Sequence, residues 1–104
     1  MKTHFIKTIN PYFQYAWEWR KPFEVRLNDR DYQYGDKVVL QEYDEMKKKY
    51  GIREIHGTIN FVLYGYYAVK EDHVIFSYET TLRKDGDNIY PILESRPLDR
   101  FLKL

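Results

Sequence analysis

Apolar and polar residues alternate along much of the chain, and this period of two is typical of half-buried β-strands. The clearest example is residues 55–63, where an apolar residue or a glycine occupies every second position. Further strands are predicted at residues 3–8, 23–27, 37–43 and 73–80, with a short extended segment at residues 89–93. The pattern therefore predicts that strands dominate the chain after its first helix.

That helix is predicted where the spacing of apolar residues becomes helical, between residues 13 and 17. The preceding pair Asn10–Pro11 is a helix-start signal, because asparagine can accept a hydrogen bond from the first turn and proline suits its backbone geometry. Pro22 disfavours helical geometry at the residue before it, so we expect the helix to end near residues 19–20.

The order of these elements predicts an α+β fold, a small and strongly bent sheet or β-barrel with one or two packed helices. We expect the tail, residues 94–104, to add a last helical turn or an ordered arm. A chain of 104 residues fits one domain with a modest core, and its 43% of hydrophobic residues argues against disorder.

Composition excludes several classes of function. The 17 basic and 16 acidic residues give a net charge of +1, which argues against a broad surface for duplex nucleic acid but leaves room for a small basic pocket. Cysteine is absent, so no disulfide or thiolate site is expected, and three scattered histidines predict no metal site. We expect no cofactor. No stretch resembles a signal peptide or a membrane span, so a cytoplasmic location and no membrane partner are expected.

The densest charge cluster surrounds the strand predicted at residues 23–27. On an extended strand Glu24 and Arg26 lie on one side, and Lys21 stands at the turn where its ammonium can reach the same side. Such a group can hold a planar polar ligand or a phosphate: arginine offers a fork of donors, lysine a mobile charge, and glutamate an acceptor for an exocyclic amine. The alternative is a solvated strand face with weak surface ion pairs.

A resemblance favours the pocket over the solvated face. The stretches "RKPFEVRLNDRDYQYGDKVVLQEYD" and "GIREIHGTINFVL" resemble small bacterial and phage proteins related to the ASCH domain, which has a PUA-like fold. The ASCH motif, glycine-x-Lys-x-x-Glu-x-Arg, maps onto Trp19, Lys21, Glu24 and Arg26, with tryptophan in the place of glycine. The resemblance implies a PUA-like β-barrel over residues 1–80, with residues 81–104 as a C-terminal extension packed on it.

The resemblance also implies a ligand cleft between helix and barrel that binds RNA or a modified, nucleoside-like molecule. His4 stands where the related proteins tend to carry histidine, so it either lines the cleft or bonds to the protein itself. Trp19 either closes over the cleft and stacks on a base or packs in the fold. Asn28 either stabilises a turn or lies at the pocket edge.

Two alternatives to simple binding remain. Some ASCH relatives resemble amidohydrolases that remove an acyl group from a modified cytidine, with the motif lysine and a threonine three residues later. Lys21 fits this role, but Glu24 occupies the threonine position, and Thr58 or Ser77 are the candidate substitutes. The other alternative is a protein-interaction module of a phage or mobile element that uses residues 81–104. The sequence leaves the oligomeric state open.

Overall fold

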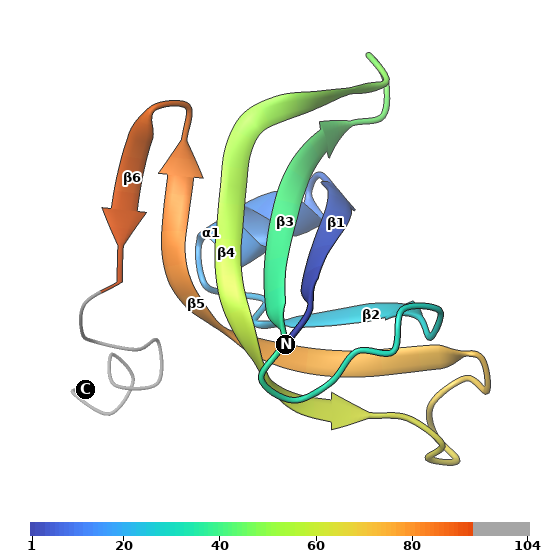
Figure 1. Cartoon of the computed structure of the whole chain (residues 1–104). Coiled ribbons are helices and arrows are strands. Elements are labelled where there is room, and N and C mark those ends of the chain that lie inside the picture. Colours follow the sequence, from blue (N-terminus) through green and yellow to red (C-terminus); the bar gives the residue numbers. More distant parts are fainter. Residues whose placement is uncertain (93–104) are drawn as a thin grey trace, which may run out of the picture.

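Six strands form one sheet in the computed structural model, which describes residues 1–92 (Figure 1). The strands follow the order β1-β3-β4-β5-β2, with β6 paired to β5; β1 and β3 are parallel and the other pairs antiparallel. The elements along the chain are β1 (Thr3–Ile9), α1 (Tyr12–Trp17), β2 (Phe23–Leu27), β3 (Lys37–Asp44), β4 (Lys49–Leu63), β5 (His73–Asp85) and β6 (Asn88–Pro91).

The sheet curls into a half-barrel because its two longest strands, β4 and β5, bend along their length (Figure 1). Their pairing shifts register between His56 and Gly57 and again between Ile59 and Phe61, and such bulges increase the local twist. A side chain at position 57 would come within 2.9 Å of the β5 backbone, so the close approach of the strands requires glycine. β1 and β2 stand at the two ends of this strand order.

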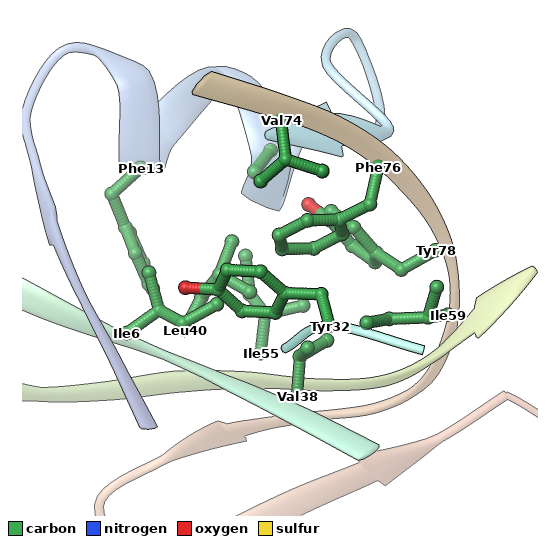
Figure 2. Packing of buried hydrophobic residues seen from close by; sticks show 11 residues of the cluster. Ile6, Phe13, Tyr32, Val38, Leu40, Ile55, Ile59, Val74, Phe76 and Tyr78 are labelled. Carbon is green, nitrogen blue, oxygen red and sulfur yellow. The ribbon is translucent and has the colours of Figure 1, made fainter. Parts of the chain in front are cut away.

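The core fills the inside of the curl (Figure 2). The side chains of the cluster come from β1, α1, β3, β4, β5 and the segment between β2 and β3. They are Ile6, Phe13, Ala16, Tyr32, Val38, Leu40, Ile55, Ile59, Val74, Phe76 and Tyr78. The helix α1 therefore packs on the same face of the sheet as the rest of the core, with Trp17 partly buried beside it.

The prediction of an α+β fold with packed helices is wrong. The structure is 57% strand and 7% helix, and α1, the helix found in residues 1–92, has six residues. It ends early because Trp19 adopts a left-handed conformation with φ of 63°. The Trp19 N–H donates to the Ala16 carbonyl and the Arg20 N–H to the Tyr15 carbonyl, which is the Schellman pattern of helix termination.

The five strands predicted between residues 3 and 80 are confirmed, as β1 to β5. Two strands are longer than expected: β4 begins at Lys49, and β5 continues to Asp85 before a tight turn leads into β6. The domain boundary at residue 80 stays a prediction, and the tail expected to form a helical turn or arm lies outside the described residues.

Candidate functional site

A cleft of about 450 Å³ lies between the edge strands β1 and β2, where the curled sheet does not close. Its size falls within the range of small-molecule sites. The residues that line it come from β1, the first turn of α1, and the segment that enters and forms β2. They are Lys7, Thr8, Ile9, Tyr12, Lys21, Glu24, Val25 and Arg26.

β2 turns its charged side inward and its apolar side outward. Glu24 is only 2% exposed, whereas Phe23, Val25 and Leu27 on the other side are 41%, 51% and 52% exposed. The strand is thus half-buried, as the alternation predicts, but the buried half is the polar one. A carboxylate at this depth requires paired charges and hydrogen bonds to offset its lost hydration.

Lys21 and Arg26 supply those partners to Glu24. The Lys21 Nζ lies 2.5 Å from one carboxylate oxygen, while the Arg26 Nε and Nη2 lie 3.0 and 2.7 Å from the other. The same ammonium also donates to the Phe23 carbonyl at 2.8 Å, and the Arg26 Nη2 lies 3.4 Å from the Thr8 hydroxyl on β1. The structure therefore brings Lys21, Glu24 and Arg26 together as a triad on the cleft wall.

Tyr78 of β5 contacts the backbone at Lys21. The Tyr78 hydroxyl, which is buried, donates to the Lys21 carbonyl at 3.3 Å. Burial raises the pKa of Tyr78 strongly, and the negative charge of Glu24 acts in the same direction. Tyr78 consequently stays a neutral hydrogen-bond donor at all ordinary pH values.

His4 lies outside the cleft lining, in a buried polar cluster near the start of β1. Its Nε2 is 2.8 Å from the Asp36 carboxylate, and its ring contacts Tyr32 at a centroid distance of 4.6 Å. Burial acts to raise the pKa of Asp36, but hydrogen bonds from His4 and from the Lys2 and Gln33 backbone N–H groups outweigh it, so this pKa is lowered. This geometry fits the structural alternative for His4.

Trp19 and Asn28 also lie outside the cleft lining. The Trp19 ring faces the Arg83 guanidinium, whose carbon is 5.6 Å from the ring centroid. Asn28 is exposed just after β2, and its backbone N–H donates to the Asp72 carbonyl at 2.9 Å. Both residues therefore make contacts within the fold, and a ligand-binding role for either stays a prediction.

Thr8 and Tyr12 line the cleft but do not stand out in the sequence. A signal for Thr8 exists, because it continues the inward-facing period of His4 and Ile6 along β1. Its place opposite Arg26 depends on the curl of the sheet, which no local pattern reveals. Tyr12 opens α1 and is half exposed at the cleft.

The two hydroxyl residues considered for a hydrolase lie elsewhere. Thr58 on β4 accepts a hydrogen bond from the Lys37 ammonium at 3.0 Å, outside the cleft lining. Ser77 on β5 is hydrogen-bonded to Asn60 at 2.6 Å, also outside it. Within the cleft lining, Thr8 is the residue with an aliphatic hydroxyl.

Within residues 1–92, no three histidine, aspartate or glutamate side chains gather closely enough to hold a metal ion. The same part of the chain contains no helix that is long and apolar enough to span a bilayer. A family model described as "Domain of unknown function (DUF3850)" matches residues 3–78, which include every residue of the cleft lining. No curated protein matches the chain.

Proposed function

The chain belongs to the DUF3850 family, and we propose that it is a binding domain whose cleft between β1 and β2 holds RNA or a modified, nucleoside-like molecule. The observation that carries this proposal is the buried Glu24 with its two cations on the cleft wall. A curled β half-barrel is compatible with such a binding role.

The stability of the fold is a weak explanation for this triad. Apolar side chains of similar size replace buried ion pairs with little loss of stability, and sometimes with a gain. A cleft that recognises a polar ligand, in contrast, needs cations fixed in place before the ligand arrives. The half-exposed Tyr12 ring at the same cleft adds a surface on which a base can stack.

We extend the proposal to a relationship between this family and ASCH domains. Two observations support it. The three charged positions of the ASCH-like motif, Lys21, Glu24 and Arg26, meet in one cleft. The position where the motif has glycine is occupied by Trp19 with φ of 63°, a conformation that glycine adopts without strain.

Binding measurements on matched variants test the proposed function. Short single-stranded RNAs and free nucleosides are titrated into wild type, Lys21→Met and Arg26→Gln, with circular dichroism as a check of folding. A hydrogen bond to a charged group contributes about 1.5–3 kcal/mol, so each variant is expected to bind at least tenfold more weakly.

Arg20→Gln is the control, because it makes the same chemical change at an exposed arginine, which pairs with Glu18 at 3.7 Å and stacks on Tyr15. It is expected to bind like wild type. The proposal is wrong if wild type binds none of these molecules, or if the cleft variants bind as tightly as the control.

A second candidate function, an amidohydrolase acting on an acylated cytidine, is favoured by one observation. Thr8 brings a hydroxyl to the cleft that holds Lys21, although no threonine follows Lys21 by three residues. Incubation of folded protein with acetylated cytidine, followed by chromatography of the products, tests for this hydrolase activity. Absence of product excludes this substrate, and loss of product in Thr8→Val but not in Thr58→Val supports the assignment.

A further inference from the structure

Most of the hydrogen-bonding capacity that the triad leaves unused belongs to its two cations. Both carboxylate oxygens of Glu24 are occupied, one by Lys21 and the other by Arg26. The Arg26 Nη1 donates to no group in residues 1–92. Lys21 has three N–H donors and uses two of them, on Glu24 and on the Phe23 carbonyl. A ligand in the cleft therefore meets free donors from arginine and lysine, and a carboxylate that is already engaged.

The net charge of the cleft lining also favours an anionic ligand. Lys21 and Arg26 place two cations on the lining against one carboxylate, Glu24, which leaves a surplus of one positive charge. Lys7 also lines the cleft, but its ammonium lies over the Tyr43 ring at 4.5 Å. The surplus equals the net charge of +1 of the whole chain and is concentrated in this small region. Clefts lined by one sign of charge concentrate ligands of the opposite sign.

From these observations we infer that the cleft recognises a phosphate group of its ligand, with the Arg26 Nη1 and the Lys21 ammonium as donors. The inference rests on the proposed function, because it names the part of an RNA or nucleotide that the triad contacts. Guanidinium and ammonium groups are the usual protein partners of phosphate oxygens. Glu24 then acts within the protein, as the counter-charge of both cations, and does not accept from an exocyclic amine of a base.

The size of the cleft narrows the class of ligand further. A volume of about 450 Å³ lies in the lower half of the range for small-molecule sites, which favours one nucleotide over a length of strand. Tyr12 lies on the same lining as the free donors, so a base can stack on its ring while the phosphate binds the cations. The ligand class is accordingly a nucleoside monophosphate, either free or at the end of an RNA chain.

Calorimetric titration tests this inference with four kinds of probe. These are the four ribonucleosides, their 5′-monophosphates, inorganic phosphate, and one short RNA with either a phosphate or a hydroxyl at its 5′ end. We expect at least one monophosphate to bind wild type tenfold or more tightly than its nucleoside, with an affinity that falls as salt rises. The two RNAs show whether the phosphate is read on a free nucleotide or at a chain end.

Variants of Arg26 test whether this residue causes the tighter binding of the monophosphate. In Arg26→Gln the advantage of monophosphate over nucleoside is expected to fall to threefold or less, whereas Arg20→Gln keeps it in full. Arg26→Lys is a second variant that keeps a cation beside Glu24 and so protects the fold. It lacks the Nη1 group. We expect the logarithm of the affinity ratio between monophosphate and nucleoside to fall by at least half in this variant.

The outcomes separate this inference from the proposed function. If wild type binds a nucleoside and its monophosphate equally, the phosphate inference is wrong and the proposed function stands. If no nucleoside, nucleotide or RNA binds, both are wrong. If inorganic phosphate binds as tightly as every monophosphate, phosphate recognition holds but the nucleotide assignment is overturned.

Discussion

Replacing Glu24 by glutamine removes the buried negative charge of the triad while it keeps the size of the side chain. The glutamine oxygen can still face Arg26, but its amide NH2 group then meets the Lys21 ammonium, donor against donor. The variant therefore loses the contact with Lys21 and weakens both contacts with Arg26. Two cations remain at the cleft without their counter-charge.

The structure sets the size of the expected effect. Loss of one hydrogen bond to a charged group costs about 1.5–3 kcal/mol, and breaking a buried ion pair costs about 3–5 kcal/mol. The Lys21 and Arg26 side chains are 18% and 29% exposed, so water can solvate them in part and the lower end of this range applies. We expect Glu24→Gln to lower the free energy of unfolding by about 3 kcal/mol, and the melting temperature by about 15 °C.

Urea unfolding at neutral pH, followed by the fluorescence of Trp17 and Trp19, measures this difference. Glu18→Gln is the matched control, since Glu18 makes exposed contacts, a pair with Arg20 at 3.7 Å and a hydrogen bond from the Gln14 side chain at 2.8 Å, and its effect should stay within about 0.5 kcal/mol. A triple replacement of Lys21, Glu24 and Arg26 by methionine should recover most of the lost stability, because no charge is left unpaired. A Glu24→Gln effect no larger than that of the control would refute the role of Glu24 as the buried counter-charge.

Three further predictions concern other contacts of the fold, all measured by urea unfolding. The pKa of Asp36 is lowered from 3.8, so the stabilising effect of its carboxylate is complete above about pH 4 and is lost as pH falls through the lowered value. Asp36→Asn should therefore lower the free energy of unfolding by about 1–3 kcal/mol at pH 7. A difference in unfolding free energy between wild type and variant that does not narrow below pH 4 would contradict this. Gly57→Ala should cost about 1–3 kcal/mol because its methyl group meets the β5 backbone at 2.9 Å, and an unchanged unfolding midpoint would show that the strands move apart freely. Arg53→Met should cost about 2–3 kcal/mol, since Arg53 bonds to Glu42 at 2.7 and 2.9 Å and lies 4.8 Å from the Trp17 ring centroid; a cost below about 0.5 kcal/mol would mean that these contacts are solvated.

The strands were predictable from the sequence because a half-buried strand alternates apolar and polar residues between its two faces. Residues 55–63 show this clearly, and the structure places them in β4. The amount of helix was not predictable, since the spacing within residues 13–17 is helical but cannot reveal where the helix stops. That end depends on Trp19, a residue type that rarely adopts a left-handed conformation.

The triad was predictable for a similar reason, because its members are close in sequence. Glu24 and Arg26 share one face of the strand, and Lys21 stands at the turn just before it. Its surroundings were not. Thr8 is 18 residues from Arg26 and meets it only through the curl of the sheet. His4 contacts Asp36, 32 residues later and just before β3, and this long-range contact holds His4 within the fold and outside the cleft lining. Local patterns carry no information on such pairings.

β2 is the strand in which hydropathy and burial disagree, and this conflict bears on function. Shifting the strand by one residue would turn its other face inward and bury Phe23, Val25 and Leu27. Full burial of an apolar side chain contributes about 1.5–3 kcal/mol, and these three are about half exposed, so hydrophobic burial alone favours the shifted strand by about 2–4 kcal/mol. The observed register therefore needs an opposing contribution. The ion contacts of Glu24 are among the interactions that the shift would break, together with the present pairing of β2 to β5 and the contact of Arg26 with Thr8. Conflicts between a local pattern and the overall fold are expected at functional sites, and here the conflict coincides with the cleft.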